Sequence, residues 1–316
     1  MEDVSYAAFW LALGAVAFGT AVSWAHLLGI RLVMRRLATE AGEGPLVATI
    51  ETADAPPAWA ERLGRAGPVA GWAAMLLLAV WVVARWAAVE HAPWSNMYEF
   101  TTAFAAAILG FYVVFDRIYG RSQRSPPGRA MGAIVLPTVL AMLLVAAAFF
   151  PSDIRPLVPA LQNADLLAVH VATMILAYAA LSVSFAAAVL YLVQAVPDAE
   201  RRGVVRSRYE RLPRARTLDD IALRSVMVGF PLLALGIALG AYWADHAWGR
   251  YWGWDPKETS ALVTWLIYGI YLHTRGLRGW SGRRSAWVLV AGFGAVMFTY
   301  FAVNLWVSGL HSYAGV

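Results

Sequence analysis

The sequence predicts an all-α integral membrane protein, a polytopic bundle of about eight transmembrane helices. Hydrophobic residues make up 60% of the chain and charged residues only 14%, and the mean hydropathy is +0.58. The apolar residues also gather in long runs separated by short polar segments, as in membrane proteins. The chain has no cysteine, which excludes disulfides, thiolate ligands and thiol nucleophiles.

Eight apolar runs approach the ~20 residues that a helix needs to cross the hydrocarbon core. The first follows the acidic start MEDVSYAAFWLALG. A cleaved signal peptide has a basic flank instead, so we expect a retained span. The seventh run has a helix-start signal, with Asp255 as candidate N-cap, Pro256 in the first turn and Glu258 reaching back to the cap. In chain order the predicted spans cover residues 5–30, 67–89, 99–116, 131–150, 168–195, 221–242, 258–274 and 285–307.

The distribution of arginine predicts the orientation of the bundle. Four connections carry 5, 4, 7 and 4 arginines, namely residues 31–66, 117–130, 195–220 and 274–284. The alternate connections carry only three basic residues, Arg155, Arg250 and Lys257. Because cytoplasmic loops are rich in Lys and Arg, we expect both termini and residues 243–257 on the extracytoplasmic side. Arg85 and Arg224 lie near span ends and are expected to snorkel to the interface. The formal charge of +5 then reflects topology, and nucleic-acid binding is not expected.

The stretch WADHAWGRYWGWDPKE, residues 243–258, crowds aromatic and charged side chains between the sixth and seventh spans. Its aromatic residues are Trp243, Trp248, Tyr251, Trp252 and Trp254. They fit two interpretations. One is an aromatic belt at the membrane surface, although belt residues are usually scattered around helix ends. The other is a platform for a large planar ligand, because indole faces offer broad and stiff contact. The DPKE portion is explained by the helix cap, so we assign no catalytic carboxylate there.

Six histidines are present, His26, His91, His170, His246, His273 and His311. The predicted topology brings His170 and His311 to the same face as the tryptophan-rich segment. Two neutral imidazoles facing each other across an aromatic-lined cleft suit six-coordinate haem iron. His273 lies 15 residues beyond Glu258, which is ~22 Å along a helix. It is therefore expected in the inner half of the membrane, as a separate functional candidate.

The other three histidines have weaker assignments. His26 could reach the layer of His273, or it could serve in helix packing. His91 is an alternative ligand at the outer face, and His246 could be a solvated loop residue.

Four stretches in this order carry a family signature: PWSNMYEF (93–100), LVPALQNADLLAVHV (157–171), WGRYWGWDPKETSALVTWLIYGIYLHTR (248–275) and LHSYAGV (310–316). They resemble the CcsA/ResC family of cytochrome c biogenesis proteins, which belongs to the wider group of tryptophan-rich "WWD" haem-handling proteins. The resemblance covers most of the chain from about Trp86. The first two spans and the 31–66 connection carry little of it. We expect an N-terminal transmembrane pair (1–90) with a cytoplasmic linker (31–66), followed by a cytochrome c assembly domain (91–316) whose external WWD segment is 243–258.

The resemblance implies haem handling in the system II pathway of cytochrome c maturation, at the cell membrane. His170 and His311 match the two external axial ligands of haem b. His273 matches the histidine of an inner, transmembrane haem site whose second ligand comes from a CcsB/ResB-type partner subunit. That complex joins haem to the CXXCH motifs of apocytochrome c. The chain is thus expected to form part of a holocytochrome c synthase and to depend on a thiol-reducing pathway. The family commonly has aromatic residues at Ser260 and near Asp165, so fewer rings are expected around the ligand here.

No residue is an obvious nucleophile or general acid, so catalysis is expected to come from holding vinyl group and thiol in near-attack geometry. Arg250, Lys257 and Arg155 are candidate contacts for the haem propionates, because they are the basic residues expected outside. Three alternatives stay open: a system I-type haem chaperone or export protein, a b-type cytochrome electron-transfer subunit, and a transporter with an aromatic gate.

Overall fold

A computed structural model describes residues 1–40, 58–120, 127–154, 164–194, 213–277, 280, 282–307 and 309–311. Within them, all regular structure is helical. The long helices are α1 (Glu2–Glu40), α3 (Ala58–Val89), α4 (Met97–Gly120), α5 (Pro127–Phe149), α6 (Ala164–Gln194), α7 (Ala215–Trp248), α8 (Pro256–Arg275) and α9 (Arg283–Met297). A π-helical turn, η3 (Phe298–Ala302), and the short α10 (Val303–Leu305) continue α9. The prediction of an all-α polytopic bundle is confirmed.

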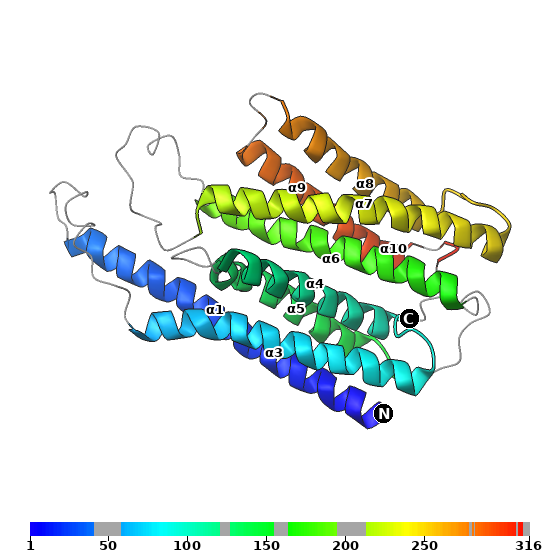
Figure 1. Cartoon of the computed structure of the whole chain (residues 1–316), viewed down its shortest axis with the longest axis horizontal. Coiled ribbons are helices and arrows are strands. Elements are labelled where there is room, and N and C mark those ends of the chain that lie inside the picture. The colour runs from blue at the N-terminus through cyan, green and yellow to red at the C-terminus, as the bar shows by residue number, and fades with distance from the viewer. Residues whose placement is uncertain are drawn as a thin grey trace.

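Seven of these helices are long and apolar enough to cross a membrane, and α8 is not among them. The protein is therefore a multi-pass membrane protein. Helix α8 coincides with the predicted span 258–274 and lies beside α7 and α9 in the bundle (Figure 1). Its 20 residues begin with the polar stretch PKETS, which lowers its hydropathy. The eighth crossing stays a prediction.

The helices run alternately up and down, so that every second helix end lies at the same end of the bundle (Figure 1). We call the end that carries Glu2 and the connection 249–255 the tryptophan end. Residues 309–311 follow α10 there. The opposite end, which carries Arg117 and Arg275, is the arginine end. This grouping agrees with the alternation inferred from arginine, while the side of the membrane that each end faces stays a prediction.

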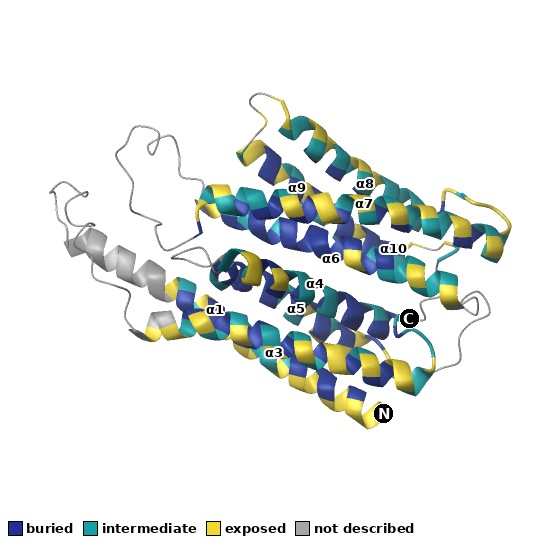
Figure 2. Ribbon diagram, viewed as in Figure 1, coloured by how far each residue is buried: buried dark blue, intermediate teal, exposed yellow. Residues whose placement is uncertain are grey.

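The bundle has two groups of helices that meet along α4 and α6. Helix α1 packs on α3 and α5, whereas α8 packs on α7 and α9, and α6 contacts α4, α5, α7 and α9. The most apolar window of α6 is 72% buried and that of α4 67%, against 33% for α1. Figure 2 shows the buried faces along these central helices and exposed residues on the outer ones. Helices α4 and α6 therefore form the core that supports both groups.

A buried ion pair ties the tryptophan-end connections together. Arg85 Nε lies 2.9 Å from Glu99 Oε1, and the two side chains are 3% and 1% exposed. Arg85 Nη2 also donates to the Ser152 carbonyl (2.8 Å). The other carboxylate oxygen of Glu99 accepts from the amide and the hydroxyl of Ser95, at 3.1 and 2.8 Å. The prediction that Arg85 snorkels was wrong. Hydropathy places Arg85 near a span end but does not show that Glu99 offers a partner.

Arg224 behaves as a surface residue at the arginine end. It is 63% exposed and pairs with Asp220 one helical turn away, at 3.1 Å. Asp220 also accepts from the Tyr119 hydroxyl (2.6 Å). This pair offers an exposed counterpart to the buried Arg85–Glu99 pair.

Candidate functional site

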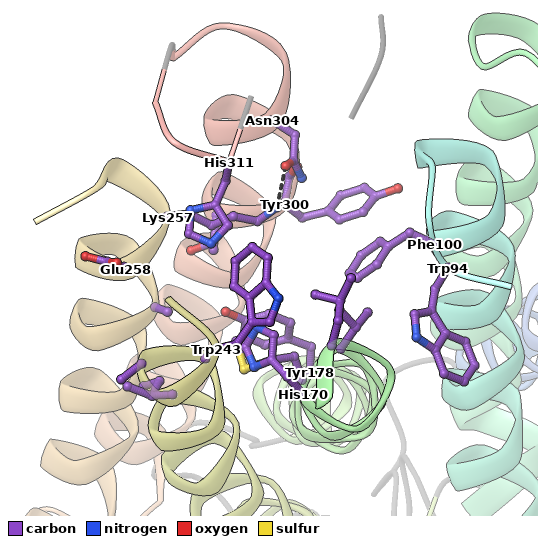
Figure 3. A pocket seen from close by; sticks show the side chains of 18 of the residues that line it. Trp94, Phe100, His170, Tyr178, Trp243, Lys257, Glu258, Tyr300, Asn304 and His311 are labelled. Atoms are coloured by element: carbon purple, nitrogen blue, oxygen red, sulfur yellow. Dashed lines mark hydrogen bonds between the residues drawn. The ribbon is translucent and has the colours of Figure 1, made fainter. Parts of the chain in front are cut away.

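A cavity of about 150 Å³ lies at the tryptophan end. It is bounded by α4 and the connection before it, by α6, α7 and α8, by Trp252 before α8, and by η3, α10 and His311. Figure 3 shows its side chains converging from these elements. The aromatic walls are Trp94, Phe100, Tyr178, Trp243, Trp252 and Tyr300. The polar lining includes His170, Lys257, Glu258, Asn304 and His311.

His170, in the second turn of α6, is held against α7. Its Nδ1 lies 2.8 Å from the Gly236 carbonyl oxygen. A carbonyl can only accept, so Nδ1 carries the proton, and in the neutral imidazole the lone pair resides on Nε2. A Cβ at Gly240 would lie 2.6 Å from His170 Cε1. Only glycine at position 240 therefore lets the helix backbone approach the imidazole this closely.

His311 is held by the N-cap of α8. Its Nδ1 lies 2.7 Å from Asp255 Oδ2, and Asp255 also accepts from the amides of Lys257 (3.0 Å) and Leu310 (2.6 Å). Burial tends to raise the pKa of Asp255, but the hydrogen bonds from His311 and the two amides outweigh it and lower that pKa to about 2. Burial lowers the pKa of His311 despite the nearby carboxylate. At neutral pH a charged Asp255 therefore accepts from a neutral His311, whose lone pair resides on Nε2.

The tryptophan-rich segment surrounds His311 only in part. The Trp243 ring centre lies 6.1 Å from that of His311, and the Trp248 ring centre lies 4.9 Å away, nearly perpendicular. Trp243 is buried and lines the cavity together with Trp252. Trp248 contacts His311 but is not part of the cavity lining. The remaining two aromatic residues, Tyr251 and Trp254, are 57% and 70% exposed and do not line the cavity.

Lys257 is the cationic side chain among the described cavity-lining residues. Its Nζ donates to Asn304 Oδ1 at 2.7 Å. Arg250 is exposed and lies over Gly253, whose Cβ would be 3.0 Å from Arg250 Nε. Arg155 lies outside the described residues.

The capping box expected of Asp255, Pro256 and Glu258 is present at the start of α8. Glu258 Oε2 accepts from the Asp255 amide at 3.1 Å and from the Gly253 amide at 2.9 Å. This geometry fixes the turn that delivers Trp252 and Lys257 to the cavity.

His273 and His26 lie away from the cavity. His273 is exposed near the arginine end of α8. His26 is buried in α1, with its ring against Gly64 of α3. Because α1 packs on α3 and α5 while α8 packs on α7 and α9, these two histidines lie in separate parts of the bundle.

His91 and His246 lie at the tryptophan end but do not line the cavity. The Nδ1 of His91 lies 3.0 Å from the Ala92 carbonyl oxygen. That of His246 lies 2.9 Å from the Tyr242 carbonyl oxygen, and the His246 side chain is exposed.

Sequence reasoning missed four of the aromatic residues that line the cavity. Trp94 and Phe100 belong to the block 93–100 that carried part of the family resemblance, so a signal was present. No sequence signal pointed to Tyr178 or Tyr300. Tyr300 sits in η3 and stacks on Phe100 at 5.7 Å, in keeping with the frequent occurrence of π-helical turns at functional sites. Neither Ser260 nor Asp165 lines the cavity.

Fold and site together define a class: a multi-pass helical membrane protein with an aromatic cavity that two histidines enter at one end of the bundle. Residues 94–311 match the family described as cytochrome C assembly protein. Three relatives, each named cytochrome c biogenesis protein CcsA, are similar over most of the chain.

The relative from Synechococcus elongatus is 37% identical over 292 residues, which cover 78% of this chain and 87% of that protein. The one from Mesostigma viride is 36% identical over 258 residues (75% and 82%). The one from Chlamydomonas reinhardtii is 38% identical over 241 residues (75% and 65%). The chain belongs to the cytochrome c assembly family, and its function lies in cytochrome c biogenesis.

Proposed function

We propose that the protein holds haem b in this cavity with His170 and His311 as axial ligands. The observation that carries the proposal is the matched arrangement of the two imidazoles. Both line one cavity, and each has Nδ1 engaged by an oxygen acceptor. The neutral tautomer of each therefore presents Nε2 as the ligating nitrogen, the usual arrangement for metal-bound histidine.

The rest of the cavity suits a porphyrin. Trp243 and Trp252 offer indole surfaces to a planar apolar ligand. Lys257 offers a cation for a propionate. Arg250 could reach a propionate at the cavity mouth, and Arg155 stays a candidate from the sequence.

We further propose that a CcsB/ResB-type partner subunit shares the work and that the tryptophan end faces the extracytoplasmic side of the cell membrane. There the CXXCH thiols of an apocytochrome c, kept reduced by a thiol-reducing pathway, would add across the haem vinyl groups. Each S–H adds to one C=C bond, so the addition needs no external oxidant or reductant. The residues of this chain hold the haem, exclude water and orient the vinyl edge, which is catalysis by positioning.

Single-ligand variants test the axial assignment. His170→Gly and His311→Gly, each purified with the partner subunit, are expected to lose most bound haem and to regain it with added imidazole, which can occupy the vacated position. Haem occupancy and the low-spin optical spectrum are the measurements. His91→Gly and His246→Gly are matched controls, because both residues lie at the same end but outside the cavity lining. Equal haem loss in all four variants would contradict the assignment.

Gly240→Ala tests the close approach of α7 to His170. The added methyl group would lie 2.6 Å from His170 Cε1, so the imidazole must move. The helix itself should not be weakened, because alanine favours a helix by about 1 kcal/mol over glycine. We expect normal amounts of folded protein with haem affinity reduced about tenfold, the lower end of the effect of disturbing a ligand's supporting contacts. Gly294→Ala in α9 is the control, since nothing lies within 4 Å of its Cβ position. Unchanged haem affinity in Gly240→Ala would show that His170 is not oriented by this contact.

We also propose that His273 belongs to an inner haem site completed by the partner subunit. Its exposure on α8 supports a ligand shared between chains, as does the packing of α8 and of the His26 helix α1 in separate parts of the bundle. A b-type cytochrome would instead pair ligands within one chain. His273→Ala is expected to lower haem occupancy of the outer cavity in cells, while haem added to the purified complex still binds there. If occupancy in cells is unchanged, His273 is not on the delivery route.

A further inference from the structure

The carboxylate of Asp255 joins the start of α8 to a second segment that lies 55 to 56 residues further along the chain. Oδ2 accepts from the Lys257 amide at the start of α8 and from His311 Nδ1 after α10. Oδ1 accepts from the Leu310 amide. The side chain is only 1% exposed, and the chain passes so close that a Cβ at Gly309 would lie 2.5 Å from Oδ1. Asp255 therefore holds the segment that bears His311 in place through two hydrogen bonds.

Capping α8 does not by itself require this carboxylate. Asn and Ser cap helices about as well as Asp, and the cap uses only the bond from the Lys257 amide. The bonds to Leu310 and His311 lie outside the capping box. They bring the negative charge of Asp255 next to the Nδ1–H of His311. His170 Nδ1 instead donates to the neutral Gly236 carbonyl.

We propose that Asp255 is a positioning residue for haem, which fixes the ring orientation and the tautomer of His311 and strengthens it as an electron donor. The proposal rests on the function proposed above. A carboxylate bound to the distal nitrogen of a ligating histidine holds the ring in place and raises the basicity of the ligand. The extra negative charge stabilises ferric over ferrous iron, so Asp255 lowers the reduction potential of the bound haem. Asp255 thus both caps α8 and orients His311.

The test compares Asp255→Asn with Asp245→Asn in the complex with the partner subunit. Asp255→Asn keeps the shape and the cap but removes the charge, and it also removes the bond from the Leu310 amide, because an amide nitrogen cannot accept it. Asp245→Asn removes a carboxylate from the same tryptophan-rich segment without touching the cavity lining. Haem affinity, the reduction potential and the optical spectrum are measured. In Asp255→Asn we expect haem binding to weaken 10- to 100-fold and the potential to rise, with a six-coordinate low-spin spectrum retained. Asp245→Asn should match the wild type.

A second variant separates positioning from folding. Asp255→Ser keeps the helix cap but is too short to reach His311, so it should bind haem no better than Asp255→Asn while yielding the same amount of α-helical protein.

The proposal is overturned if Asp255→Asn keeps wild-type affinity and potential, or if Asp245→Asn shifts both equally. His311→Gly distinguishes a failure of the proposed axial ligation from a failure of the proposed role of Asp255. If it leaves the spectrum unchanged, the proposed axial ligation itself fails. If it abolishes the low-spin form while Asp255→Asn changes nothing, only the role of Asp255 fails.

Discussion

The double variant His170→Gly/His311→Gly is expected to abolish maturation of c-type cytochromes in cells that depend on this protein. Both nitrogens that would hold the iron are then absent. Losing even a supporting contact of a ligand weakens metal binding 10- to 100-fold, so loss of both ligands should reduce haem occupancy by more than about 100-fold. Maturation is measured by haem staining of covalently attached cytochromes, and occupancy by the absorbance of the purified complex.

The double variant His91→Gly/His246→Gly is the matched control for this experiment. It removes the same number of imidazoles from the same end of the bundle, outside the cavity lining. It should support maturation at the wild-type level. Normal maturation in the His170/His311 double variant would mean that the cavity is not where haem is held for attachment.

The second large effect is expected at the buried ion pair. Arg85→Met leaves the Glu99 carboxylate 1% exposed without its cation, and breaking a buried pair in this way costs about 3–5 kcal/mol. We expect a strong loss of folded protein, together with loss of haem binding, because Glu99 also bonds Ser95 beside the cavity-lining Trp94. Thermal unfolding in lipid nanodiscs measures the stability.

The companion variant Arg85→Met/Glu99→Leu removes both charges at once. Replacing a whole buried pair by apolar residues is often nearly neutral, so we expect most of the stability to return. Arg224→Met removes an arginine from an exposed pair and should have little effect. If Arg85→Met unfolds no more readily than Arg224→Met, the buried pair does not support the cavity wall.

The fold was largely predictable because hydropathy and arginine distribution act over whole helices. The predicted span 99–116 lies inside α4, and 168–195 nearly coincides with α6. Apolar length specifies a crossing whatever its neighbours are. The grouping of the tryptophan-rich segment with residues 170 and 311 at one end followed from the alternation of the helices. Helix ends outside the apolar core were less predictable, as the start of α7 at Ala215 shows.

The detailed contacts of the site could not be predicted, because they join residues that no local pattern relates. Asp255 reads from sequence as an N-cap, and its bond to His311 spans 56 residues. The acceptor for His170 is a backbone carbonyl, which has no sequence signature. Likewise, the tryptophan-rich segment shows where an aromatic cluster lies, but not that Trp243 is buried while Trp254 points outward.

The central claim, one haem held by His170 and His311, is tested most directly by electron paramagnetic resonance and near-infrared magnetic circular dichroism of the ferric, haem-loaded complex. His273→Ala is used as background, to remove any inner-site signal. We expect a single low-spin haem with two imidazole ligands. In His170→Gly and His311→Gly, the haem that remains bound is expected to have one protein imidazole. A high-spin haem in the His273→Ala background, or a bis-imidazole signal that survives both single changes, would contradict it.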